Sequence, residues 1–301
     1  MLTSFRLFAL ALLATPVNAE VPHVVADIAP VHALVAQVMD GVGTPDLILH
    51  PGVSPHGYAL RPSQARALQQ AQLVVWIGPE LTPWLEKPLA SLATGAKRLT
   101  LLTEAETQAL PFREGADEAE EEGHDHAHEG IDPHAWLDPE NAQIWLGLIA
   151  ENLAGIDPDN AGIYRANSMN GQAEIQALVV ELNEILSPVR ANPFATYHDA
   201  FQYFEARFGL DNAGFVTLSD GAGASPARVS ALRDQLATLD VKCAFSEPGV
   251  DPGILQGINT NGDMTLAELD PMGRDLTLGV GFYSDLLRNM AQSFVNCVTR
   301  K

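Results

Sequence analysis

The sequence predicts an α/β protein with two lobes, each a mainly parallel sheet flanked by helices, joined by one long rigid linking helix. Three observations support this fold class. Short apolar runs alternate with helical patterns in both halves of the chain, which is typical of parallel strands connected by helices. The stretch after Pro158 contains no proline up to Leu186, and its apolar residues keep a spacing close to helical. The length of 301 residues suits two domains.

The first lobe is expected over residues 20–156. At its end, Asp138 can cap a helix that has Pro139 at its first position. Before that helix, strands and helices follow each other at short intervals, as in a parallel sheet with helices on its faces. In chain order they are the strand VVADIAP, the helix VHALVAQVM, the strand DLILHPG, the helix RPSQARALQQAQ, the strand LVVWIG, a helix after Pro79 and the strand KRLTLL.

Residues 113–130 interrupt this lobe with an acidic segment that has almost no apolar residue to bury, so we expect a loop there. The loop carries His124, His126 and His128. Histidines two apart in an extended segment can meet one ion, which suggests a second metal site. That site would be weaker, because ordering a loop costs roughly 1–2 kcal/mol per fixed residue. A solvated linker with incidental histidines is the alternative.

The linking helix is expected over residues 157–190 and the second lobe over residues 191–301. The second lobe repeats the alternation of the first, and Ser225 followed by Pro226 marks the start of one helix. In chain order its elements are the strand PFATYH, the helix AFQYFEARFG, the strand FVTLS, the helix after Ser225, the strand VKCAFSE, a short helix, the strand MTLAEL and a final helix near YSDLLRNMAQSFVNC.

The charge of the chain bears on its partners. It carries 38 acidic and 17 basic residues, a net charge of −21. Such a surface repels nucleic acid and anionic lipid and raises the local concentration of cations. The composition therefore excludes nucleic acid as an expected partner and suits a metal cation.

The first residues predict export. Arg6 is followed by an apolar run and by small residues that fit cleavage after Ala19, so residues 1–19 are predicted to be a signal peptide. The run is shorter than the roughly 20 residues of a membrane span. No cysteine lies near the cleavage point, so we expect no lipid anchor there.

The two cysteines of the chain are Cys243 and Cys297. In an oxidising compartment an isolated pair favours a disulfide, which would pin the last helix to the second lobe. Metal ligation by thiolates is the alternative, but it usually brings a closer spacing such as CxxC.

Three histidines lie where a cleft between two lobes could collect them. His56 lies in a loop after a predicted strand, and His198 ends the strand PFATYH of the other lobe. His134 lies between the acidic loop and the capped helix. In open α/β sheets ligands bind at the carboxyl ends of strands. We therefore predict that these three histidines converge on one metal ion.

Three imidazoles favour zinc, copper or nickel over magnesium or calcium, which require oxygen ligands. Zinc fits best, because it accepts three nitrogens and one oxygen in a tetrahedron without redox chemistry. The fourth donor is expected to be Asp270, which follows a predicted strand of the second lobe, or a water molecule. We also expect Tyr58, Trp136 and Glu247 to pack or hydrogen-bond around the cleft.

The chain contains, in order, PGVSPHGYALRPS, LVVWIGPELTPWLEK, DPHAWLDPENA, TYHDAFQYFE, FSEPG, LDPMG and YSDLLRNMAQSFVNC, besides the cysteine pair. In content, order and spacing these motifs resemble the zinc-specific solute-binding proteins of bacterial ABC importers, the ZnuA type of the cluster A-I metal-binding family. The resemblance implies that His56 and His134 come from the first lobe and His198 from the second, with Asp270 at the fourth position. Manganese- and iron-type relatives carry a carboxylate where this chain has His198, which favours zinc.

The same resemblance implies a monomeric periplasmic receptor that captures Zn²⁺ with high affinity and delivers it to an ABC-type permease with a cytoplasmic ATPase. The chain itself has no GxxxxGK[ST] phosphate loop. A zinc hydrolase is the enzyme alternative, but no HExxH-like motif occurs and Asp270 could close the coordination sphere, so we expect no enzyme. An adhesin or a metal buffer without a transporter would use the same site and stays open.

Overall fold

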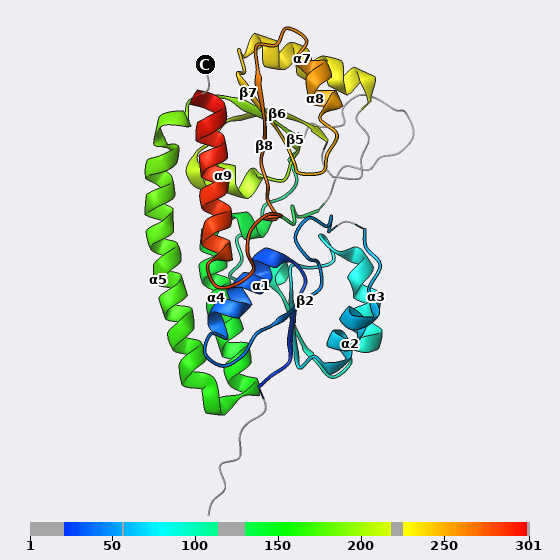
Figure 1. Ribbon diagram of the computed structural model, residues 1–301, viewed down its shortest axis with the longest axis vertical. Coiled ribbons are helices and arrows are strands. Elements are labelled where there is room, and N and C mark those ends of the chain that lie inside the picture. The colour runs from blue at the N-terminus through cyan, green and yellow to red at the C-terminus, as the bar shows by residue number, and fades with distance from the viewer. Residues whose placement is uncertain (1–20, 56, 114–129, 218–224, 300–301) are drawn as a thin grey trace, which may run out of the picture.

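The computed structural model describes residues 21–55, 57–113, 130–217 and 225–299. In this part of the chain two four-stranded parallel sheets are flanked by helices, with one long helix running beside both (Figure 1). The predicted fold class is confirmed. We call the part of the chain before that helix the first lobe and the part after it the second lobe.

The strands of the first sheet are β1 (Val24–Ala26), β2 (Asp46–Leu47), β3 (Leu73–Trp76) and β4 (Lys97–Thr100), in the spatial order β2-β1-β3-β4. Those of the second sheet are β5 (Phe194–His198), β6 (Asn212–Thr217), β7 (Cys243–Ser246) and β8 (Thr265–Glu268), in the order β6-β5-β7-β8. The two sheets thus share one topology. In each sheet the second strand lies on one side of the first strand, and the third and fourth strands lie on the other side. The topological switch point is therefore between β1 and β3 in the first sheet and between β5 and β7 in the second. Ligands of α/β proteins bind at such points.

The α-helices of the described residues are α1 (Ala29–Val38), α2 (Pro62–Gln70), α3 (Glu86–Leu92), α4 (Pro139–Ile156), α5 (Ala161–Leu186), α6 (Gln202–Phe208), α7 (Pro226–Thr238), α8 (Gly253–Ile258) and α9 (Phe282–Thr299). Two predicted caps are present. The Asp138 side chain accepts the backbone N–H of Glu140 at the start of α4, and the Ser225 side chain accepts the backbone N–H of Arg228 at the start of α7.

The long helix α5 has 26 residues, which corresponds to about 39 Å at 1.5 Å per residue. Short 3-10 turns flank it at Pro158–Asn160 and Ser187–Val189. Proline lacks a backbone N–H, so Pro158 and Pro188 lie in these turns and outside α5 itself. Helices α1, α4 and α9 each pack on α5, and α1 also packs on α4 and α9, so that together they form a helical layer along both lobes (Figure 1).

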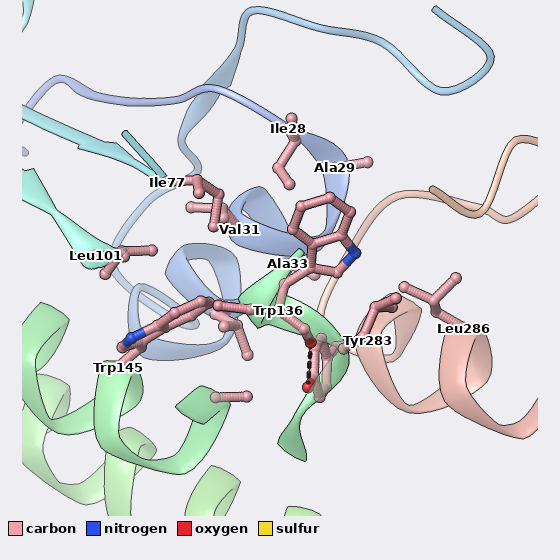
Figure 2. Packing of buried hydrophobic residues seen from close by; sticks show 14 of the residues in the cluster. Ile28, Ala29, Val31, Ala33, Ile77, Leu101, Trp136, Trp145, Tyr283 and Leu286 are labelled. Carbon is pink, nitrogen blue, oxygen red and sulfur yellow. Dashed lines mark hydrogen bonds between the residues drawn. The ribbon is translucent and has the colours of Figure 1, made fainter. Parts of the chain in front are cut away.

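A continuous apolar core crosses the boundary between the lobes. It includes β1, β3 and α1 of the first lobe and Phe194, Phe245 and much of α9 from the second. Figure 2 shows Trp136 between Ile28 of the first lobe and the α9 residues Tyr283 and Leu286. A smaller separate cluster lies under α7 and α8. The large shared core makes the two lobes one packed body, unlike domains that touch through a small polar interface.

Cys243 and Cys297 form a disulfide, which confirms the predicted pairing. The bridge joins the first residue of β7 to the last turn of α9 and so fixes the C-terminal helix to the second sheet. No helix of the described residues is long and apolar enough to span a lipid bilayer. Residues 1–20, which include the predicted signal peptide, lie outside the described residues.

Candidate metal centre

His198 is the last residue of β5 and lies at the switch point of the second sheet. Its side chain is buried, and its Nδ1 lies 3.3 Å from Oε1 of Glu247. Glu247 directly follows β7, the neighbour of β5, so the parallel pairing brings the two residues together. A carboxylate at Nδ1 orients the imidazole and favours metal binding through Nε2.

His134 is positioned by a tight local turn. One carboxylate oxygen of Asp132 accepts the backbone N–H of His134 at 2.9 Å and lies 2.7 Å from its Nδ1. This role of Asp132 was not predicted from the sequence, although an aspartate two residues before a candidate ligand is a recognisable turn signal. The imidazole also packs against Trp136, with ring centroids 5.2 Å apart.

The structure brings His134 and His198 together. Their ring centroids are 5.0 Å apart and their planes are inclined by 74°. Both rings are buried, and each has a carboxylate at Nδ1. Two imidazoles from different lobes, each oriented by a carboxylate, are the arrangement in which histidines bind a transition metal.

Asp270 lies two residues after β8, in a loop that touches the His134 turn, because Trp136 Nε1 donates to the carbonyl of Pro271 at 2.9 Å. Its Oδ1 accepts the backbone N–H groups of Met272 and Gly273, both at 2.9 Å, and its Oδ2 that of Arg274 at 2.6 Å. These bonds fix the carboxylate. Because an ionised carboxylate has about four acceptor positions, they leave capacity for a further ligand.

The other predicted metal ligands are not described. His56 lies outside the described residues, as do His124, His126 and His128 of the acidic loop. Beside residue 56, the carbonyl of Pro55 accepts Trp84 Nε1 at 2.7 Å, and Tyr58 packs on the same indole. Within the described ranges, no group of three or more His, Cys, Asp or Glu side chains is placed to hold a metal ion.

A buried ion-pair cluster adjoins the second-lobe side of the centre. Arg113, the first residue of the acidic loop, pairs with Glu205 and lies 3.4 Å from Asp199. Burial raises the pKa of Asp199 to about 6 and that of Glu205 to about 7, while the Arg113 guanidinium opposes both shifts. Arg113 therefore anchors one end of the acidic loop to α6.

The buried carboxyl of Asp27 lies at the switch point of the first sheet, directly after β1. Its two oxygens accept the backbone N–H groups of Ile28 and Ile77, both at 2.8 Å. Burial raises the pKa of Asp27 from 3.8 to about 7, against the opposing effect of these donors. Asp27 thus joins the ends of β1 and β3.

Residues 24–297 match the family described as ZnuA, zinc-uptake complex component A, periplasmic. The chain belongs to the ZnuA family. The resemblance seen in the sequence is therefore confirmed. A curated relative named high-affinity zinc uptake system protein ZnuA, from Paracoccus denitrificans, is 43% identical over 96% of each chain.

Solved structures agree with this membership at the level of the fold. A structure titled as a zinc-bound ZnuA deletion mutant superposes with a TM-score of 0.77 at 22% identity, covering 94% of this chain and 100% of the other. The binding protein FpvC of Pseudomonas aeruginosa in complex with Mn²⁺ gives a TM-score of 0.78 at 22% identity, covering 93% and 99%. Since these neighbours were solved with different metals, the fold of the ZnuA family does not by itself determine which metal is bound.

Proposed function

We propose that this chain is a high-affinity receptor that captures Zn²⁺ in the periplasm and delivers it to the permease of an ABC-type zinc importer. The observation that carries the proposal is the pair of buried imidazoles, His134 and His198, contributed by the two lobes and held 5.0 Å apart between ring centroids. Membership of a zinc-uptake family supports it.

The proposed ligands are His56, His134, His198 and either Asp270 or a water molecule. The carboxylates of Asp132 and Glu247 lie at Nδ1 of His134 and His198, and in the proposed site they orient the imidazoles so that each presents Nε2 to the ion. A set of three nitrogens and one oxygen matches the tetrahedral preference of Zn²⁺. Copper and nickel accept the same donors, so the preference for zinc is part of the proposal.

The family is one of binding receptors for zinc uptake, and the chain is not an enzyme. The membrane permease and its ATPase are the proposed partners, and the receptor is proposed to act as a monomer. Residues 1–19 are proposed to be the signal peptide, residues 20–156 and 191–301 the two metal-binding lobes, and residues 157–190 the link between them. His124, His126 and His128 are proposed to form a second, weaker zinc site.

The test is a zinc titration of the metal-free protein against a chromophoric chelator. The parent is expected to bind one zinc ion tightly, and the single variants His56→Ala, His134→Ala and His198→Ala to lose that site. His23→Ala is the matched control, because His23 is an exposed histidine at the start of the first sheet. Retention of tight binding by any of the three site variants would remove that residue from the ligand set.

Two further variants separate the remaining alternatives. Asp270→Asn should weaken zinc binding if the carboxylate is the fourth ligand and leave it nearly unchanged if water is. Replacing His124, His126 and His128 together by alanine should abolish the weaker binding event alone. Metal analysis of protein purified from its native compartment decides the metal, and manganese in preference to zinc would overturn the specificity.

A further inference from the structure

The segment Asp132–Asp138, which carries His134, contains little regular secondary structure. Apart from the 3-10 turn Ala135–Leu137, its backbone runs between the acidic loop and α4 without a strand or helix. Its position must therefore come from contacts with other parts of the chain. Those contacts decide where the imidazole of His134 stands relative to His198.

The second lobe holds this segment on both sides of His134. On one side, Tyr203 of α6 donates its hydroxyl to the carbonyl of Asp132 at 2.7 Å. On the other side, Tyr283 of α9 donates its hydroxyl to the carbonyl of Trp136 at 2.8 Å (Figure 2).

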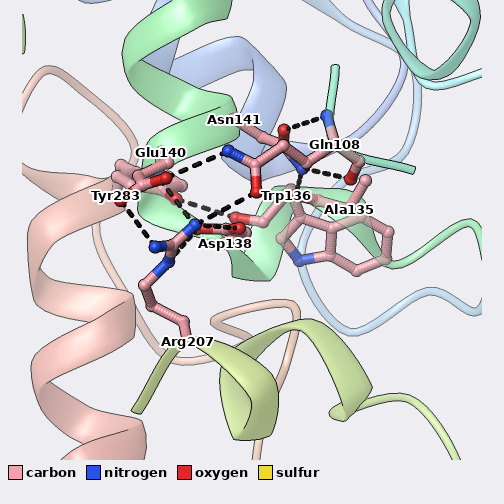
Figure 3. Close-up of polar contacts among 8 residues, drawn as sticks. All are labelled: Gln108, Ala135, Trp136, Asp138, Glu140, Asn141, Arg207 and Tyr283. Atoms are coloured by element: carbon pink, nitrogen blue, oxygen red, sulfur yellow. Dashed lines mark hydrogen bonds and ion pairs between the residues drawn. The ribbon is translucent and has the colours of Figure 1, made fainter. Parts of the chain in front are cut away.

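The segment also ends in a bidentate ion pair. Arg207 of α6 directs Nε and Nη2 at the two carboxylate oxygens of Asp138, both at 2.8 Å (Figure 3). The same carboxylate accepts the backbone N–H of Glu140 at 2.9 Å and so begins α4. A fork of two parallel bonds fixes orientation as well as distance, which a single contact does not.

The two tyrosines and the Asp138 carboxylate lie in the interior, while the Arg207 side chain is 20% exposed. Tyr203 is 1% exposed, Tyr283 2% and Asp138 5%. Hydrogen bonds shielded from water are electrostatically stronger than exposed ones, and a buried carbonyl that loses its donor has no water to replace it. The segment is therefore held firmly by groups that follow α5 in the chain, although it precedes α5 itself.

We propose that Tyr283 and Arg207 are positioning residues for the metal centre: they hold the His134 segment against the second lobe and thereby control how fast the bound zinc leaves. This inference rests on the proposed zinc function. With His198 on β5 and the His134 segment fastened to α6 and α9, the two imidazoles keep their separation before metal arrives. Loosening the segment lets His134 move away, so the change appears mainly as faster dissociation.

The chain offers a matched test of this role. Tyr283→Phe deletes one hydroxyl and leaves the ring in the core. Tyr164→Phe is the control, because Tyr164 is equally buried and donates its hydroxyl at 2.8 Å to Asp157, at the opposite end of α4. Both variants should lose comparable thermal stability. Only Tyr283→Phe should release zinc about tenfold faster, the size typical of losing a contact that supports a metal ligand.

Cobalt substitution gives a second readout that a purely structural role would not change. The visible absorption of Co²⁺ reports coordination geometry, so it should shift in Tyr283→Phe and stay unchanged in Tyr164→Phe. If Tyr283→Phe fails to fold, Arg207→Lys decides, since it keeps the charge but loses the fork. Its control is Arg288→Lys, which removes the same two-bond geometry from the more exposed pair with Glu181 between α5 and α9.

The outcomes separate this inference from the function it rests on. Faster zinc release and an altered Co²⁺ spectrum in the Tyr283 or Arg207 variant, absent from the controls, support it. Dissociation rates and spectra equal to those of the controls overturn it while zinc binding by the parent stands. A parent chain that binds no zinc overturns the proposed function, and this inference with it.

Discussion

The contact between Asp132 and His134 gives a prediction whose size follows from the structure. Asp132→Asn keeps the shape of the side chain and removes its charge. The Asp132 carboxylate is 1% exposed and lies 2.7 Å from Nδ1 of His134, so solvent hardly screens the interaction. Hydrogen bonds to charged groups contribute about 1.5–3 kcal/mol and neutral ones about 0.5–1.5 kcal/mol, and the midpoints of these ranges differ by about 1.25 kcal/mol. That difference corresponds to about a tenfold weaker zinc affinity.

The assay is a competitive zinc titration of the parent and Asp132→Asn at one fixed pH. Asp157→Asn serves as the control, since Asp157 is also buried and accepts side-chain hydrogen bonds, but at the far end of α4. The control should lose stability and keep its zinc affinity. An affinity of Asp132→Asn within twofold of the parent would refute the role given to this carboxylate, and so would an equal loss in the control.

Four further predictions concern stability and pH. Burial in the folded state raises the pKa of Asp27 from 3.8 to about 7. The protonated carboxyl therefore contributes up to about 4 kcal/mol to the free energy of unfolding at acid pH, and this contribution is lost as the pH rises through about 7. Denaturation in EDTA at pH 5 and pH 8 should show a flatter pH dependence for Asp27→Asn than for the parent, and equal dependence would contradict this. Replacing Cys243 and Cys297 together by serine should lower the free energy of unfolding by roughly 4 kcal/mol, because the disulfide closes a loop with a sequence separation of 54. Zinc affinity should be kept. A loss below about 1 kcal/mol in urea denaturation would argue against the chain-entropy account. Histidines bind zinc as neutral imidazoles, so titrations at successively lower pH should show falling affinity, and a constant affinity would speak against histidine ligands. Ser225→Ala should lower the free energy of unfolding by about 1 kcal/mol, because the cap on α7 is lost, and no change in urea denaturation would show that the cap is unimportant.

Much of the fold could be predicted because its signals are local. Apolar runs such as that of β3 are buried on both faces of a parallel sheet, so they stand out in the sequence. Asp138 and Ser225 are capping residues that indicate where the helices after them begin. The disulfide could be predicted because the chain has two cysteines and is expected in an oxidising compartment.

The details of the metal centre depend on contacts between distant residues, which a single sequence does not display. Glu247 lies beside His198 because β5 pairs with β7, and the sequence predicts Glu247 near the cleft without indicating its partner. In the sequence, Tyr203 and Tyr283 look like ordinary core aromatic residues, because the residues around them do not indicate which carbonyl groups accept their hydroxyls. The unusual burial of Asp27 was missed for the same reason, since a polar residue at a strand end is normally solvated.

The packing of α9 against α1 and α5 has a consequence for the order in which the protein can fold. The first helix and the last lie at opposite ends of the described chain, and contacts of such long sequence separation form late because the loop between them must close first. Until α9 is available, the apolar face of α1 that it covers stays open. A chain shortened before Phe282 should therefore aggregate instead of forming a stable first lobe.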